Sequence, residues 1–554
     1  MNRGLKLPIL LATLLALAMT EPLIVHLASE TQLVDSIGDP LYLTWQVAWL
    51  GHALLHDPFH LFQTNLYFPI KSNLVFTDVL FGYMPAGLFA TTSPQAALVV
   101  HNLIFISTFA LAFLGAFLLA RELGAGAWGG VAAGAAFSYA PWKLAQSGHL
   151  QILSSGGIPL SLYLLVRGYR RGSGRLIVAG WLVAAWQMTL GFNLGLQLAY
   201  LLLVLGVGVG VRWLRPGRIR PTNSVLRASA AGLAAFTLVT ALVAATYLRV
   251  QHHYPQATMP TSEVAYFSPP PRAFIAASRY SSLWSGPTAH VRATLRWSVE
   301  QTLFPGVTVV LLALAGLASA TYSRRLRAGL AAATIVCVAL SLGLPSAAHP
   351  DRGLMPFRIL RDLAPGWNGV RTPGRINNLT SLGLALLSAA GIALVVRGAG
   401  RFRARGGVHV VPAALVAAIL AEGFGPLPHI HVPAVPPGQL AAPAPQLNLP
   451  TKAGLDGLYA YWGIGPFPRM ANAASSFDPV VVADIRRAST NFPNPPSVRF
   501  FRRLGIRTVI LHRSLARRTP WRDVAGRSIV GLGITRSDTG DLVVYRLGRL
   551  KRAP

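Results

Sequence analysis

The chain has 554 residues, of which 53% are hydrophobic and only 12% are charged, and its mean hydropathy is +0.48. A soluble globular domain carries about twice that charged fraction. Too little polar surface is therefore present to cover a water-soluble core of this size, which excludes an ordinary soluble protein. The single cysteine, Cys337, excludes an internal disulfide and a cysteine-based zinc site. We predict an integral membrane protein.

The formal net charge of +31 would, in a soluble chain, be typical of a nucleic-acid-binding protein. Almost all of the basic residues are arginines, and many lie in short loops between apolar runs, where the positive-inside rule predicts them. No basic stretch with interleaved aromatic residues and no readout motif is present. We expect the lipid bilayer as a partner and no nucleic acid.

The first apolar run, Leu7–Leu27, follows a basic amino end and is compatible with a signal peptide. We favour an uncleaved first span, because the run continues through Thr20-Glu21-Pro22 to the roughly twenty residues that a bilayer needs. Further apolar runs lie near Ala96–Ala120, Trp128–Ala140, Ile158–Leu165, Leu176–Leu190, Leu194–Val211, Ala228–Tyr247, Val307–Ala320, Ala328–Leu344, Leu379–Val396 and Val408–Leu420. The sequence predicts about eleven transmembrane helices.

Short arginine-rich loops alternate with long loops between these runs. The arginine loops, 167–175, 212–220, 324–327 and 397–405, are expected on the cytoplasmic side of a bacterial inner membrane, together with the amino terminus. The opposite loops are long and rich in Trp, Tyr, His and Pro. Long loops without regular structure are usually functional, so we expect the chemistry on the extracytoplasmic side.

The carboxyl-terminal part differs in composition from the apolar part. We divide the chain into a transmembrane domain (1–424), a Pro-rich linker (425–450) and a small extracytoplasmic α/β domain (451–554). Strands are predicted at Thr508–His512 and Leu542–Leu547, and helices at Val481–Arg487 and Ser497–Leu504. The fold class is thus an all-α polytopic membrane protein with a small α/β appendage.

The first long loop (28–78) carries the sharpest motif. Gly38-Asp39-Pro40 is a good turn and helix start, and a helix is predicted over Leu41–Leu55. Trp45, Trp49 and His52 follow the spacing i, i+4, i+7 and share one face. Because Trp is enriched at membrane interfaces, we interpret this as an amphipathic interfacial helix.

At these residues the chain resembles the polytopic glycosyltransferases of the C superfamily (GT-C), in particular a largely uncharacterised bacterial branch. The resemblance covers nearly the whole chain and is most specific in its opening. That opening reads Pro22-Leu23, His26-Leu27, Gly38-Asp39-Pro40, Trp45, Ala48-Trp49, Asp57-Pro58, Asn65 and Phe68-Pro69. Weaker similarities are Phe137–Trp142 with Gln146, His149-Leu150-Gln151, and Arg371-Thr372-Pro373-Gly374-Arg375.

The resemblance implies an inverting transfer of a hexose or pentose from a polyprenyl-phosphate donor to an extracytoplasmic glycan, lipid or protein. It also implies that an acidic residue of the first loop acts in this reaction. A carboxylate that deprotonates the attacking hydroxyl must lie within about 3 Å of that oxygen. Asp39 is the best candidate and Asp35 the second; the alternative is that Asp39 only forms the turn or caps the helix.

The leaving phosphate needs cations near the membrane surface. Arg371 and Arg375 precede a span on the expected outer side, and His149 is a further candidate. Nonspecific pairing with lipid head groups and a structural histidine are the alternatives. A divalent cation is a possible cofactor, with His252, His253 and Asp57 as weak candidates and surface positions as the alternative.

Two other functional classes stay open. A transporter or lipid flippase would need charged residues in the middle of several spans, and apart from Glu21 these runs are nearly free of acids. A non-catalytic scaffold that presents the carboxyl-terminal domain would have much the same sequence.

Overall fold

The computed structural model describes residues 3–33, 36–215, 221–345, 355–401, 407–474 and 476–548. Asp35, the second acid proposed for catalysis, lies outside the described residues. The chain divides into two compact units, each made of three segments. The first unit is Met1–Val25, Ile104–Thr246 and Thr258–Pro428, and the second is His26–Leu103, Tyr247–Ala257 and His429–Pro554.

A helix lies on every predicted apolar run. These helices are α1 (Arg3–Met19), α4 (Pro94–Leu123), α5 (Gly126–Ser138), α7 (Gly157–Arg171), α8 (Gly174–Met188), α9 (Phe192–Leu214), α10 (Asn223–His253), α14 (Val307–Ala318), α15 (Arg324–Ser341), α17 (Asn377–Arg401) and α18 (Gly407–Gly423). Among the described residues, five helices are long and apolar enough to cross a membrane. The chain is a multi-pass membrane protein, and a total of eleven crossings stays a prediction.

The first helix is shorter than predicted. Helix α1 ends at Met19, and a separate 3-10 turn follows at Leu23–Val25. Pro22 has no backbone N–H and disfavours helical geometry in the residue before it. The prediction of one helix over Leu7–Leu27 was therefore wrong, because the apolar run contains a helix-breaking residue.

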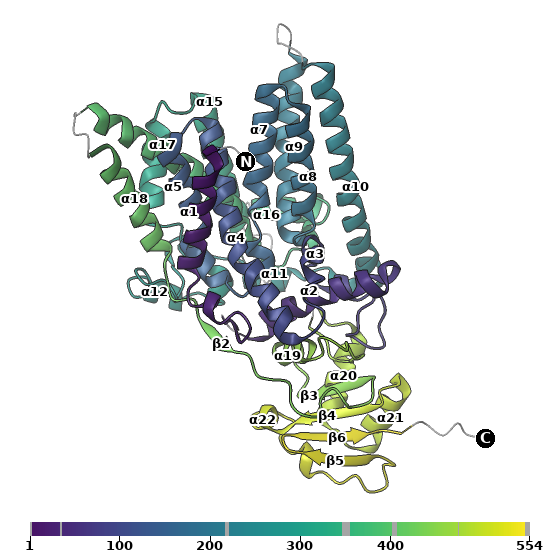
Figure 1. Cartoon of the computed structure of the whole chain (residues 1–554). Helices are drawn as coiled ribbons and strands as arrows, with labels where there is room; N and C mark the ends of the chain where they lie inside the picture. The colour runs from purple at the N-terminus through teal and green to yellow at the C-terminus, as the bar shows by residue number, and fades with distance from the viewer. Residues whose placement is uncertain are drawn as a thin grey trace. The chain divides into compact units, whose positions relative to one another are not determined.

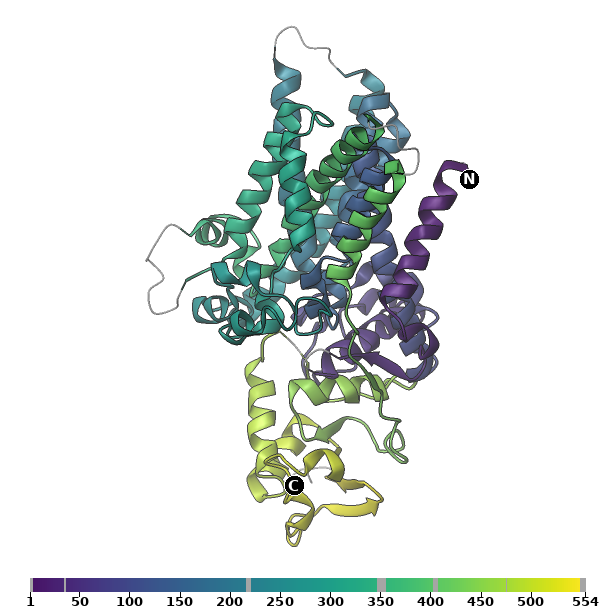
Figure 2. The ribbon, with the colours of Figure 1, turned by 90° about the vertical axis from the view of Figure 1, so that its left-hand side faces the viewer.

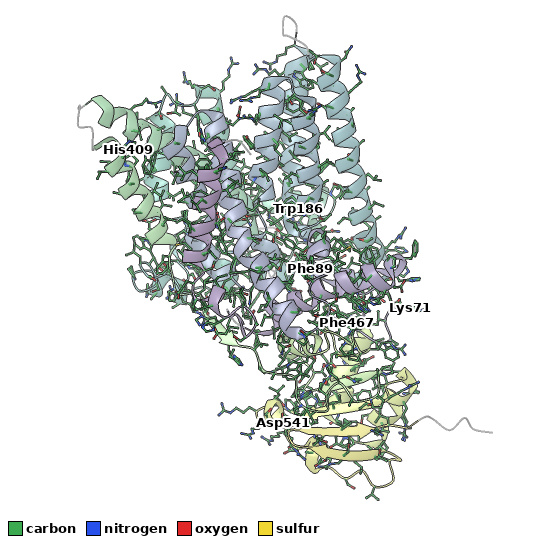
Figure 3. All side chains as sticks on the ribbon, in the orientation of Figure 1. Lys71, Phe89, Trp186, His409, Phe467 and Asp541 are labelled. Atoms are coloured by element: carbon green, nitrogen blue, oxygen red, sulfur yellow. The ribbon has the colours of Figure 1, made fainter. Side chains whose placement is uncertain are left out.

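Helix α17 lies in the middle of the first unit and packs against α5, α14, α15 and α18. Figure 1 shows α5, α15, α17 and α18 next to one another, Figure 2 shows the helices of this unit in a turned view, and Figure 3 adds the side chains. The α14 and α17 backbones touch at Gly316 and Gly391, where an added Cβ would overlap the carbonyl oxygens of Leu387 and Leu312. Small residues permit this close packing of apolar helices.

Shorter helices occupy the long loops and the carboxyl-terminal part. They are α2 (Gly38–His56), α3 (Met84–Gly87), α6 (Leu150–Leu153), α11 (Thr261–Phe267), α12 (Ala289–Ala293), α13 (Ser298–Gln301), α16 (Pro356–Leu363), α19 (Ala453–Trp462), α20 (Val480–Thr490), α21 (Pro495–Leu504) and α22 (Arg513–Ala516). The predicted helices at 481–487 and 497–504 are confirmed as parts of α20 and α21.

The second unit contains two small sheets. One pairs β1 (Glu30–Gln32) antiparallel with β2 (His429–His431). The other has the order β3-β4-β6-β5, formed by β3 (Gln446–Leu449), β4 (Thr508–His512), β6 (Leu542–Arg546) and β5 (Thr535–Thr539). Only β3 and β4 are parallel. The predicted strands at 508–512 and 542–547 are confirmed as β4 and β6.

The Pro-rich segment between the two halves of the sequence is not simply a connector. Strands β2 and β3 both come from the predicted linker 425–450. Strand β2 pairs with the first long loop through the register Glu30↔His431. The loop 28–78 and the carboxyl-terminal segment therefore belong to one compact unit.

Candidate functional site

Asp39 lies in the first turn of helix α2, and its side chain is exposed. Ile37 is the residue before the helix, so Asp39 is not the cap of α2. The Gly38 N–H donates to Ser36 Oγ at 3.0 Å and thereby fixes the helix start. A carboxylate in the first turn is stabilised by the helix dipole. Asp39 is thus an exposed carboxylate at the start of a helix in the first long loop.

Helix α2 is buried on several faces within its unit. Trp45 is fully buried, and its Nε1 donates to Asn65 Oδ1 at 3.1 Å. Gln46, from another face of the helix, is also fully buried; it donates to Asp78 O at 3.0 Å and accepts from Leu80 N at 3.1 Å. The helix is therefore not amphipathic, because Gln46 on another face finds backbone partners at Asp78 and Leu80. A position of Trp45, Trp49 and His52 at the membrane interface stays a prediction.

The aromatic residues of α2 form a continuous stack instead. The ring centroids are 6.2 Å apart for Trp45 and Trp49, 5.3 Å for Trp49 and His52, and 4.4 Å for His52 and Phe467. Phe467, labelled in Figure 3, follows α19 in the chain. Burial and the neighbouring His56 lower the pKa of His52. The stack joins α2 to the carboxyl-terminal segment of the same unit.

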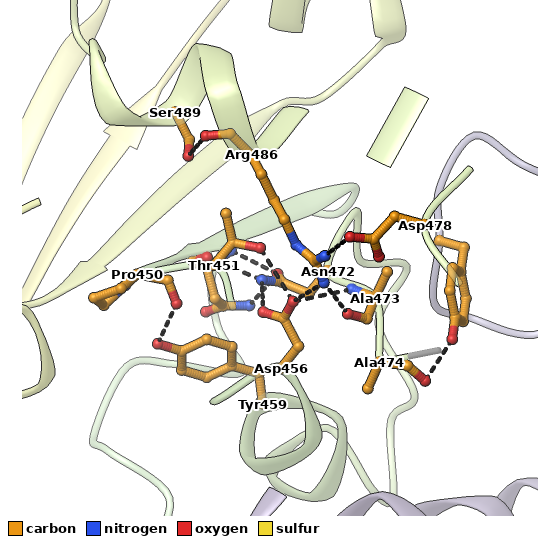
Figure 4. A network of polar contacts seen from close by, with 12 residues as sticks. Pro450, Thr451, Asp456, Tyr459, Asn472, Ala473, Ala474, Asp478, Arg486 and Ser489 are labelled. Atoms are coloured by element: carbon orange, nitrogen blue, oxygen red, sulfur yellow. Dashed lines mark hydrogen bonds and ion pairs between the residues drawn. The ribbon is translucent and has the colours of Figure 1, made fainter. Parts of the chain in front are cut away.

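A buried polar network in that segment surrounds Asp456 of α19 (Figure 4). Asp456 accepts hydrogen bonds from Asn472 Nδ2 at 2.8 Å, Thr451 Oγ1 at 3.1 Å and Ala473 N at 3.4 Å, and it pairs with Arg486 at 3.4 Å. Burial raises the pKa of Asp456 to about 7, although Arg486 and the hydrogen bonds oppose this. Sequence reasoning missed this group, because its partners come from separate loops.

In the first unit, the predicted phosphate ligands lie around Glu300 of α13. Arg375, on a 3-10 turn at Pro373–Ile376, donates to Glu300 through Nη2 at 2.5 Å and through Nε at 3.2 Å. His149 Nε2 lies 3.9 Å from the same carboxylate, and its Nδ1 lies 3.0 Å from Gln146 Oε1. Gln146 Nε2 donates to Glu300 Oε2 at 3.3 Å. The structure thus brings Arg375 and His149 together through an acid that sequence reasoning missed.

Glu300 is charged in this environment. Burial alone would raise its pKa, but Arg375, and after it His149 and Arg371, hold the pKa of this carboxyl at about 2. Arg371 lies in the preceding residues; it pairs with Glu263 at 3.4 Å and covers the Phe267 ring at 4.9 Å. Each arginine therefore has a carboxylate partner of its own, and both lower the pKa of Glu300. The Pro373-Gly374 turn, rather than an early helix start, separates them.

Lys143 is a buried amine on the 3-10 turn Pro141–Gln146, the same turn that carries Gln146 of the Glu300 group. Its Nζ lies 4.2 Å from the Phe137 ring centroid and donates to Ser155 Oγ at 3.3 Å. Burial lowers the pKa of Lys143 to about 7. The sequence offered one signal for Lys143: a lysine is unusual between Phe137–Trp142 and Gln146, which carry part of the resemblance to the GT-C proteins.

The weak candidate ligands for a divalent cation are not brought together in the structure. Asp57 contacts His60, with 2.8 Å between Oδ1 and Nδ1, and both are exposed. His252 and His253 end helix α10, and their rings are nearly perpendicular, with an interplanar angle of 82° and centroids 5.7 Å apart. No group of three or more His, Cys, Asp or Glu side chains that could hold a metal ion occurs within the described ranges.

Comparisons with known proteins bear on the fold. No family model matches the chain. No curated protein matches it either. Among solved structures, the arabinofuranosyltransferase AftD from mycobacteria has 15% identity and a TM-score of 0.56; the match covers 100% of this chain and 42% of AftD. The chain thus spans less than half the length of that protein.

Two further structures are less similar. The oligosaccharyltransferase of Archaeoglobus fulgidus has 12% identity and a TM-score of 0.44, with 91% of this chain and 69% of that chain covered. ArnT from Cupriavidus metallidurans has 13% identity and a TM-score of 0.36, with 98% of each chain covered. The likeness to AftD shows that this chain shares its fold, and that fold agrees with the expectation from the sequence motifs.

Proposed function

We propose that the protein is a membrane glycosyltransferase that moves a sugar from a polyprenyl-phosphate-linked donor to an extracytoplasmic glycan, lipid or protein. The observation that carries the proposal is the exposed Asp39 carboxylate at the start of α2, in the first long loop of a GT-C fold. Fold alone does not determine function. A carboxylate at this loop position can accept the proton that the acceptor hydroxyl loses, which is the proton transfer that the reaction needs.

The proposed reaction is an inverting displacement. Asp39 takes the proton of the acceptor hydroxyl while that oxygen forms a bond to the anomeric carbon. The bond between that carbon and the phosphate oxygen breaks at the same time, and the polyprenyl phosphate leaves with the electron pair. Displacement from the opposite side inverts the anomeric centre. The donor sugar is a hexose or a pentose.

Arg371, Arg375 and His149 are the proposed ligands of the donor phosphate. Both members of the Arg371–Glu263 pair are 35% exposed, whereas Arg375 is 11% and Glu300 5% exposed. Arg371 can therefore exchange its carboxylate for a phosphate at lower cost than Arg375. We assign the direct bidentate contact to Arg371, with Arg375 and His149 adding positive charge beside it.

The test is transfer of radiolabelled sugar by the purified chain in proteoliposomes, with hexosyl and pentosyl polyprenyl-phosphate donors and Asp39→Asn as the variant. Loss of a general base costs about 10²- to 10⁴-fold in rate, so we expect at least a hundredfold loss with unchanged donor binding. Asp57→Asn, an exposed acid of the same loop, is the matched control and should stay active.

The outcomes separate the proposals. Full activity of Asp39→Asn would contradict the role of Asp39 as the base. A wild-type chain that moves donor lipid across the bilayer without transferring its sugar would favour the transporter or flippase alternative. The anomeric configuration of the product, measured by NMR spectroscopy, tests inversion. An added chelator tests whether a divalent cation is required.

A further inference from the structure

The start of helix α2 rests directly on the backbone of helix α19, within the second unit. A Cβ added to Gly38 would lie 2.5 Å from Gly454 O, and one added to Gly457 would overlap the carbonyl oxygen of Gly38. No side chain separates the two helices at this crossing. Asp39 directly follows Gly38, so the position of its backbone depends on where α19 lies.

Helix α19 is itself fixed at the same turn by a buried, hydrogen-bonded carboxyl group. Asp456 lies between Gly454 and Gly457 in the sequence, is 1% exposed and accepts hydrogen bonds from Thr451 and Asn472 (Figure 4). Its ion pair with Arg486 connects α19 to α20. Moving α19 would break these contacts in a buried environment, which is costly. The helix is therefore a rigid support for the first turn of α2.

We propose that α19 is a positioning element for catalysis: Gly454, Asp456 and Gly457 of the carboxyl-terminal segment set the position of the Asp39 carboxylate without contacting the substrate. This inference rests on the proposed function of Asp39. It assigns to the carboxyl-terminal segment a role in the rate of sugar transfer. Misplacement of a reacting group by about 1 Å can cost about 10²-fold in rate, so small shifts of α19 are sufficient.

The first experiment measures transfer by Gly457→Ala and Gly454→Ala. The Gly457 substitution collides with the Gly38 backbone and should lower kcat at least tenfold while the donor Kd changes less than twofold. The Gly454 substitution meets first the Ser36 hydroxyl at 2.7 Å, a movable group, so it should fold well and lower kcat less. Gly526→Ala is the matched control, because Gly526 is exposed and an added Cβ there meets nothing within 4 Å.

A double-mutant cycle separates positioning from general damage. If Gly457→Ala acts through Asp39, it should change the residual rate of Asp39→Asn less than twofold, since residues that act as a unit are not additive. Independent, multiplying effects of the two substitutions would contradict the inference. So would unchanged kcat in both glycine variants when Asp39→Asn is inactive.

A second measurement does not depend on activity. A helix start lowers the pKa of a thiol below its usual value of about 8.5, so in Asp39→Cys with Cys337→Ser the thiol at position 39 should be alkylated quickly. Adding Gly457→Ala should raise that thiol pKa and slow alkylation several-fold, whereas Gly526→Ala should not. An unchanged alkylation rate overturns the inference. A slowed rate in a chain that transfers no sugar overturns the proposed function alone.

Discussion

Two glutamate–arginine pairs of the first unit differ mainly in burial. Glu300 and Arg375 are 5% and 11% exposed, whereas Glu263 and Arg371 are both 35% exposed. Removing one partner of a buried pair costs about 3–5 kcal/mol, but a solvent-exposed pair contributes about 0–1 kcal/mol. We therefore expect Glu300→Gln to lower the free energy of unfolding far more than Glu263→Gln. Urea unfolding in detergent measures both, and equal losses would contradict this account.

The Glu300 carboxyl also makes stability depend on pH. Its pKa falls from the ordinary value of 4.5 to about 2 on folding, so the unfolded chain binds more protons between these values. The stabilisation is present above about pH 4.5 and is lost as the pH falls toward about 2. We expect the unfolding midpoint to drop with acidification across this window in the wild type. The same scan should be flatter for Glu300→Gln.

At the scale of elements, Asp456 of helix α19 should make stability depend on pH in the direction opposite to Glu300. Burial raises the pKa of Asp456 from 3.8 to about 7, so the folded chain holds this proton where the unfolded chain has lost it. The contribution of Asp456 to the stability of the second unit should therefore be fully present below about pH 3.8 and be lost as the pH rises toward about 7. Asp456→Asn should remove this slope. Asp484→Asn, a surface acid paired with Arg487, should keep it.

Elements with local signals could be predicted from the sequence, whereas contacts between distant segments could not. Strand β4 and helix α21 follow their residue patterns almost to the residue. The exposed position of Asp39 follows from its turn motif. The pair of Glu300 with Arg375 joins residues 75 positions apart, and no local pattern indicates it. The expected amphipathic pattern of α2 failed for the same reason, since Gln46 finds a partner in the loop around Asp78.

At the scale of the whole molecule, the number of crossings decides where the carboxyl-terminal segment lies. Helix α15 has 18 residues, which at about 1.5 Å each is close to the roughly 30 Å hydrocarbon core. It begins with Arg324, Arg325 and Arg327, as the positive-inside rule predicts for a cytoplasmic end. Arg325 lies at the start of α15, and the predicted spans between it and the carboxyl-terminal segment are α15, α17 and α18, of which α17 is among the five helices long and apolar enough to cross a membrane. We predict that all three cross, which would put that segment on the opposite side from Arg325.

Single-cysteine labelling in a Cys337→Ser chain tests this topology. Arg325 is exposed, and the side chain of Arg522 is 69% exposed, so both positions are accessible to a reagent, unlike the buried Trp521 beside the latter. We expect Arg522→Cys to react with a membrane-impermeant maleimide in intact cells and Arg325→Cys to react only after permeabilisation. Arg403, in the last arginine loop, is expected to behave like Arg325 but lies outside the described residues.

Reaction of both tested positions from the same side would mean an even number of crossings between them. Helix α15, α17 or α18 would then not span the bilayer, and an extracytoplasmic sugar transfer by this chain would lose its topological basis.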